Sequence, residues 1–219
     1  MILVTLSTIG VVQTSRGDTI AAMTNSGQSF APNSLERFVV RQRITMMVNR
    51  YEIRANDKEG PVLAIAQQKR MAMKEKVTFF ADEERTQPVF GFQARQVMDL
   101  AATYDITDAA GQPIGLFQKD FKASMLRSTW LFESPAQQLQ GRGQERNQAI
   151  AILRRFADFS WPIHFDFATS DGTTALSVVR GWSLRDSYDC ELPALPNGDR
   201  LDWRIGASLA VACDALMAR

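Results

Sequence analysis

Residues 201–217 read LDWRIGASLAVACDALM, a run that is apolar on nearly every side when it is drawn as a helix. No charged residue occurs in residues 205–213, and such helices are normally enclosed by lipid or by the rest of their own protein. A membrane crossing needs about 20 consecutive apolar residues, and this run is bounded by Arg204 and Asp214. The run therefore predicts a helix enclosed in the core of the protein.

A helix of this kind needs a shell, and the chain before it consists of short apolar or alternating runs separated by turn signals. The expected strands are Arg37–Thr45, Tyr51–Arg54, Val62–Ala66, Val77–Phe80, Pro88–Phe92, Tyr104–Thr107, Pro113–Phe117, His164–Phe167, Ala175–Val179, Trp182–Leu184 and Tyr188–Leu192. Each hairpin has an apolar face that it cannot bury alone, and closure of the strands removes exposed sheet edges. The pattern predicts a mainly β fold, a closed antiparallel β-barrel around the C-terminal helix.

Two segments differ from this strand pattern. Residues 1–34 start with an apolar strand-like run and continue, over residues 13–34, as a polar stretch that we expect to be a loop or arm. The barrel domain is then expected to span residues 35–219. Gly141–Gly143 indicate a break, after which Gln144–Asp158 has the periodicity of one amphipathic helix.

Composition excludes some classes of protein and favours a compartment. The chain holds 25 Lys and Arg against 24 Asp and Glu, which argues against a protein that coats nucleic acid. Cys190 lies in a strand-like run and Cys213 in the expected helix, so both are interpreted as reduced structural thiols. The apolar start lacks the positive residues that begin a secretory signal and is too short to cross a bilayer. We therefore expect a cytoplasmic protein.

A basic segment lies early in the chain. Ten basic and five acidic residues occur between Glu36 and Lys76, whereas residues 158–219 hold nine acidic and five basic ones. Several cations on a strand edge attract phosphate oxygens through charge-assisted hydrogen bonds. The candidate anion-binding residues are Lys69, Arg70, Lys74, Lys76, Arg41 and Arg43. A second, weaker cluster consists of Lys119, Lys122 and Arg127. For both clusters the alternative is an ordinary solvated surface.

Catalytic and metal-binding patterns are weak in this sequence. His164 is the one histidine, and it alternates with Phe165 on a predicted strand, which favours a solvated position. No serine or cysteine lies in a nucleophile motif, and Gly141–Gly143 lacks the strand-turn-helix context of a phosphate loop. We therefore expect no catalytic residue, no bound metal and no cofactor.

An acidic group precedes the last helix. It consists of Asp186, Asp189, Glu191, Asp199 and Asp202. Carboxylate oxygens can bind calcium, but helix caps and turns account for most of these residues, and Asp199 or Asp202 is suited to cap the final helix.

The strand meander that ends in an enclosed helix resembles the tubby C-terminal-like superfamily, which includes tubby domains, phospholipid scramblases and the LURP-one-related proteins. The LURP-one-related branch is most similar. The resemblance is carried by Tyr51 with Gly60–Val62, Tyr104 with Gly111–Gly115 and Gln118–Lys119, Asp186–Asp189, Asp199 and Ala207–Asp214. It implies a barrel of about twelve strands threaded by the C-terminal helix, with Gln144–Asp158 as an added helix between strands.

The same resemblance implies a role in binding. Gln68–Lys76 resembles the basic segment through which tubby domains bind phosphoinositides, although it is less densely basic and Glu75 interrupts it. In scramblases, calcium is associated with the region of the acidic group. We therefore expect a non-enzymatic barrel that binds an anionic lipid headgroup or a protein partner, with peripheral attachment to a membrane in the first case. Alternatives are a scramblase-like membrane protein, an enzyme with an unrecognised site and a scaffold. Nucleic-acid binding ranks last.

Overall fold

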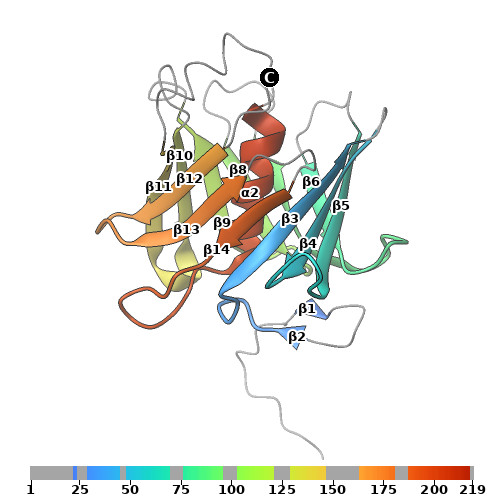
Figure 1. Cartoon of the computed structure of the whole chain (residues 1–219), viewed down its shortest axis with the longest axis horizontal. Coiled ribbons are helices and arrows are strands. Elements are labelled where there is room, and N and C mark those ends of the chain that lie inside the picture. Colours follow the sequence, from blue (N-terminus) through green and yellow to red (C-terminus); the bar gives the residue numbers. More distant parts are fainter. Residues whose placement is uncertain are drawn as a thin grey trace, which may run out of the picture.

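Helix α2 (Trp203–Met217) lies inside a closed β-barrel (Figure 1). The computed structural model describes residues 22–23, 29–44, 48–69, 76–95, 103–120, 129–146, 163–180 and 187–217. Every residue of α2 from Trp203 to Cys213 is buried. The prediction of an enclosed C-terminal helix is therefore confirmed.

Twelve strands form the barrel wall, and they are antiparallel throughout. Their bounds are β3 (Arg37–Ile44), β4 (Val48–Ala55), β5 (Val62–Lys69), β6 (Lys76–Phe80), β7 (Pro88–Ala94), β8 (Thr103–Asp108), β9 (Pro113–Lys119), β10 (Thr129–Ser134), β11 (Leu139–Glu145), β12 (Ile163–Thr169), β13 (Thr174–Arg180) and β14 (Ser187–Glu191). Each pairs with the next along the chain, and β14 closes the ring on β3. The predicted closed barrel of about twelve strands is confirmed.

The start of α2 is fixed by the residue that precedes it. The backbone N–H of Arg204 donates to Asp202 Oδ1 at 2.9 Å, so Asp202 caps the helix as one of the two expected candidates. Asp199 has a different role, because its Oδ1 accepts a hydrogen bond from Asn33 Nδ2 at 3.1 Å.

The barrel is filled by α2 and by large side chains that face inward from the wall. The Phe79 and Phe90 rings stack with centroids 4.3 Å apart, and Phe90 meets Trp203 of α2 edge to face at 5.4 Å. Gly115 on β9 makes room for α2, because a Cβ there would lie 2.8 Å from Ile205 Cδ1. The small residue in the wall thus lets the helix approach the sheet closely.

Strands β10 and β11 differ from the prediction. Gly141–Gly143 are not a break, and Gln144 and Glu145 do not begin a helix, since all of them belong to β11. A Cβ on Gly143 would lie 2.2 Å from Phe167 Cε1, so the ring of the neighbouring strand occupies the space that a side chain would need. The rest of the expected helix, residues 147–158, lies outside the described residues.

The N-terminal arm is only partly a loop. β1 (Ala22–Met23) and β2 (Ser29–Phe30) pair as a small separate sheet within the stretch expected to be irregular (Figure 1). The backbone N–H of Trp203 donates to the Pro32 carbonyl at 2.9 Å, which ties this arm to the start of α2. The strands expected at residues 1–12 and 182–184 lie outside the described residues.

Candidate functional site

Two of the six predicted anion-binding residues lie on the outer face of β3. Phe38 and Val40 face the core, so the alternate positions Arg41 and Arg43 face outward, where Arg41 is half-buried and Arg43 is exposed. The basic segment Gln68–Lys76 lies about 30 residues further along the chain, so the sequence alone does not show how close Arg41 and Arg43 are to it. In the barrel, β4 separates β3 from β5, so Arg41 and Arg43 lie one strand away from the strand that ends at Lys69.

Arg50 on β4 is a site residue that the sequence reasoning missed. It is the register partner of Arg43, so two guanidinium groups occupy directly opposite positions on neighbouring strands. Arg50 Nη2 pairs with Glu83 Oε1, but its Nε is buried and has no hydrogen-bond partner among the described residues. One sequence feature could have identified Arg50. It alternates with Tyr51, the inward-facing residue that starts a predicted strand.

The acid nearest to Arg41 is already engaged. Glu52 is the register partner of Arg41 on β4, is 5% exposed and forms an ion pair with Arg54 Nε. Arg41, Arg43 and Arg50 therefore form a cationic surface on β3 and β4, which we call the basic face.

Two more of the predicted residues, Lys69 and Lys76, lie at the same end of the next two strands. Lys69 is the last residue of β5, and Lys76 is the first residue of β6. The pair Ala66 and Phe79 sets a register that, continued by three residues, brings Lys69 level with Lys76. Arg70 and Lys74 lie outside the described residues.

Lys76 also borders a groove on the outside of the barrel. The groove has a volume of ≈ 720 Å³ and crosses β6, β7 and β8. Gly91 lies in its middle strand, with Thr78 and Thr107 as its register partners on either side. A groove of mixed polar and apolar lining thus adjoins the exposed Lys76 side chain.

Of the second basic cluster, the structure describes only Lys119, which lies on β9 and not on the basic face. Lys119 ends β9, and its ammonium lies 5.6 Å from the centroid of the Trp130 ring, a cation–π contact. Lys122 and Arg127 lie outside the described residues.

His164 lies on the outer face of β12, as expected, and two polar neighbours surround it. Its Nε2 lies 3.3 Å from Ser177 Oγ and 3.4 Å from Asp166 Oδ1. In a Ser-His-Asp triad the serine and the carboxylate contact different ring nitrogens. Here both approach the same nitrogen, and Ser177 Oγ also donates to Asp166 Oδ1 at 3.1 Å. The cluster therefore lacks the arrangement that activates a serine.

The acidic group before α2 is dispersed by the fold. Glu191 lies 3.7 Å from Arg37, Asp202 binds Arg204, and Asp199 accepts from Asn33 in the arm. Asp189 occupies an outward position of β14, and Asp186 lies outside the described residues. Within the described ranges, no three histidine, cysteine or acidic side chains come together in a group that could hold a metal ion.

The alternative of a membrane-spanning protein would require a helix that is long and apolar enough to cross a bilayer. In the part of the chain that the structure describes, no helix combines the length and apolar character that a bilayer span requires.

Comparison with known proteins bears on the family. A family model described as LURP-one-related matches residues 62–214, from β5 into α2, which is well over half of the 219 residues. No match was found among curated proteins or among solved structures. The wider kinship with tubby domains and scramblases stays a prediction. Because the family model matches residues 62–214, the chain belongs to the LURP-one-related family.

Proposed function

We propose that this chain is a non-enzymatic barrel protein that binds an anionic lipid headgroup on its basic face. The family match and the closed barrel are consistent with a non-enzymatic role. The observation that carries the proposal is the direct opposition of Arg43 and Arg50 on adjacent strands. Like charges in this position destabilise a sheet, and a bound anion between them relieves the repulsion.

The hydrogen-bonding state of Arg50 supports the same ligand. Its buried Nε–H has no acceptor among the described residues, while Glu83 occupies only Nη2. A buried unpaired donor costs about 1–3 kcal/mol, and a phosphate oxygen that reaches it recovers this cost. Phosphate oxygens also suit guanidinium groups, which bind them through paired hydrogen bonds.

The position of the lysines extends the surface toward a membrane. Lys69 and Lys76 lie at the ends of β5 and β6, on the same end of the barrel as Arg43 near the end of β3. Juxtamembrane basic residues contribute about 1 kcal/mol each to binding of an anionic leaflet. Binding of this kind makes the protein a peripheral membrane protein.

Flotation with liposomes tests the proposal. Phosphatidylcholine vesicles with and without a phosphatidylinositol phosphate are mixed with the wild-type protein and with the double variant Arg41→Glu, Arg43→Glu. We expect the wild type to float with the anionic vesicles, and we expect the variant's partition coefficient to fall at least about 30-fold, because two favourable charges are removed. Added salt should weaken the wild-type binding.

A matched control reverses two charges elsewhere on the surface. Arg37→Glu with Lys58→Glu changes the net charge equally, but Arg37 is six residues from Arg43 along β3, about 20 Å away, and Lys58 lies in an exposed turn. This control should float like the wild type. Equal flotation of the wild type with neutral and anionic vesicles, or equal loss in both double variants, would contradict the proposal.

A further inference from the structure

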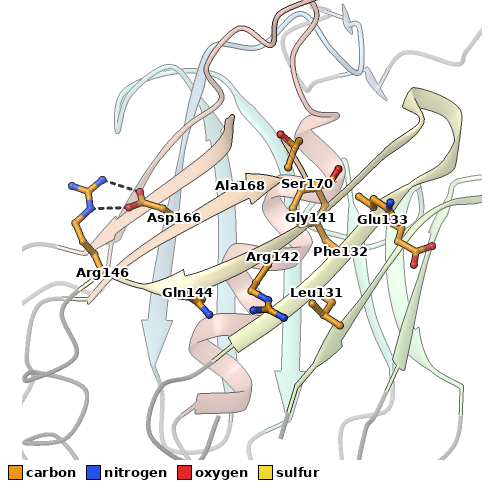
Figure 2. Close-up of a pocket in the computed structure, with 12 residues that line it drawn as sticks. Leu131, Phe132, Glu133, Gly141, Arg142, Gln144, Arg146, Asp166, Ala168 and Ser170 are labelled. Atoms are coloured by element: carbon orange, nitrogen blue, oxygen red, sulfur yellow. Dashed lines mark hydrogen bonds and ion pairs between the residues drawn. The ribbon is translucent and has the colours of Figure 1, made fainter. Parts of the chain in front are cut away.

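A second groove crosses the outer face of β10, β11 and β12, on strands that the basic face does not include (Figure 2). Its volume is ≈ 630 Å³, within the range of small-molecule sites. Arg142 projects from β11, the middle strand of the three, and its side chain is exposed. The groove therefore has one cationic side chain near its centre.

The cross-strand neighbours of Arg142 are apolar, whereas its outward neighbours along β11 are Gln140 and Gln144. Its register partners are Leu131 on β10 and Ala168 on β12, and both are half-buried. Among the described residues the Arg142 guanidinium makes no hydrogen bond and no ion pair. A guanidinium between two hydrocarbon surfaces offers five N–H donors that only water satisfies in the free protein.

The acids that border this groove do not serve Arg142. Asp166 accepts hydrogen bonds from Arg146 Nε at 2.7 Å and from Arg146 Nη2 at 3.0 Å, as Figure 2 shows. Asp166 Oδ1 also accepts from Ser177 Oγ at 3.1 Å. Glu133 lies at the next outward position of β10, opposite Gln140 rather than opposite Arg142.

The net charge of the residues that line the groove favours one class of ligand. Two arginines, Arg142 and Arg146, face two acids, Glu133 and Asp166, so the lining carries no net charge. A doubly charged phosphate gains little from such a surface, whereas a carboxylate carries one charge and matches one guanidinium through two parallel hydrogen bonds. The flanking Leu131 and Ala168 suit an apolar body attached to that carboxylate.

We propose that this groove binds an organic carboxylate, with the carboxylate paired to Arg142 and the apolar part of the ligand against Leu131 and Ala168. The site is independent of the basic face. It gives a role to the Gly141–Gly143 segment, in which the two glycines face the core and Arg142 faces the groove.

Titration by nitrogen-edited NMR tests this proposal with octanoate as the probe. We expect octanoate to shift amide signals of β10, β11 and β12 in the wild type. In Arg142→Gln, which keeps an exposed polar side chain, the affinity should fall at least about tenfold through loss of the charge-assisted pair. Arg37→Gln, an exposed arginine of β3, is the matched control and should bind like the wild type. The far-UV spectrum and thermal midpoint of each variant check its fold.

Further probes separate charge from hydrophobic contact and identify the source of the carboxylate. Octanol and octyl phosphate should bind more weakly than octanoate. Comparable affinity for either one, or unchanged octanoate affinity in Arg142→Gln, overturns the proposal.

Acetyl-leucine and its neutral amide represent a peptide C-terminus, and tighter binding of acetyl-leucine than of octanoate assigns the site to a peptide carboxylate. The variant Arg41→Glu, Arg43→Glu should keep octanoate binding, so failure of the lipid proposal does not decide this one.

Discussion

Cys190 shows how a single side chain couples this core to pH. It faces inward on β14, is 1% exposed and, like Cys213, is not part of a disulfide. Burial raises the pKa of the Cys190 thiol well above its ordinary value of 9.0, and the charges of Asp189 and Cys213 act in the same direction. A neutral buried thiol packs as a small hydrophobe and is a poor nucleophile.

This shift predicts a loss of stability at alkaline pH. Below pH 9.0 the thiol is protonated in both states and has no effect on the pH dependence of unfolding. Above it, the unfolded chain releases the proton first, so the free energy of unfolding falls by about 1.4 kcal/mol per pH unit until the folded thiol ionises. We expect Cys190→Ala to reduce this alkaline slope in urea unfolding experiments, measured from about pH 8 to about pH 10.5.

Val178 provides the control for this titration. It is the register partner of Cys190 on β13, is fully buried and does not titrate. Val178→Ala should lower stability by a similar amount at every pH, because only a packing contact is lost. A Cys190→Ala variant with the same alkaline slope as the wild type would show that another group carries the pH dependence.

The start of α2 depends on a buried ion pair between Asp202, which precedes the helix, and Arg204 in its first turn. Asp202 is 7% exposed and Arg204 is 5% exposed, and Arg204 Nη2 lies 2.6 Å from Asp202 Oδ2. Asp202 also caps the helix through the Arg204 N–H. Since the two charges are removed from water together, each is costly when the other is absent.

A double-mutant cycle tests this coupling. Asp202→Ala should destabilise the protein by about 3–5 kcal/mol, because it leaves the Arg204 guanidinium buried without its partner. Adding Arg204→Met should recover most of that loss and leave the cost of the missing cap, about 1 kcal/mol. Guanidinium chloride unfolding measures both values. Equal destabilisation in the single and double variants would mean that the cap, and not the buried charge, dominates.

At the level of strands, the sequence was informative where an apolar run follows a turn. Val62–Ala66 and Pro113–Phe117 both follow Gly-containing turns, and both are strands. Burial alternates along Pro113–Phe117, whereas Leu63–Ala66 is buried throughout. β11 could not be found in this way, because its inward positions include two glycines whose space is filled by Phe132 and Phe167 from adjacent strands. At these two positions β11 shows no apolar residue, because side chains of the neighbouring strands fill the space.

The candidate sites depend on the register between paired strands. Arg41 and Arg43 could be named from the sequence, but their position opposite Glu52 and Arg50 follows from the register of β3 and β4. Likewise, the apolar flanks of Arg142 come from β10 and β12, and β10 was not predicted. Composition identifies the charged groups, whereas the register of the paired strands decides which of them meet.

At the level of the whole molecule, we expect closure of the barrel and burial of the helix to be coupled. The ring closes where β14 pairs with β3, so the two ends of the barrel sequence meet beside α2. The segment before the helix is also anchored, because Gln137 Nε2 donates to the Arg200 carbonyl at 2.6 Å and the Asp202 N–H donates to Gln137 Oε1 at 3.0 Å. These contacts hold the helix start against the wall, so we expect the helix to stay enclosed while the wall is closed.

We therefore expect α2 and the barrel wall to open as one cooperative unit in hydrogen-exchange measurements. We expect amides of residues 205–213 to exchange only through global unfolding, with the same opening free energy and denaturant dependence as the central amides of β3 and β14. The separate β1–β2 sheet is the internal reference and should exchange by local opening, because two short strands are marginal alone. If α2 exchanged with a lower opening free energy than β3, the helix would be leaving an intact barrel. Enclosure by the twelve strands would then not be what holds the helix in place.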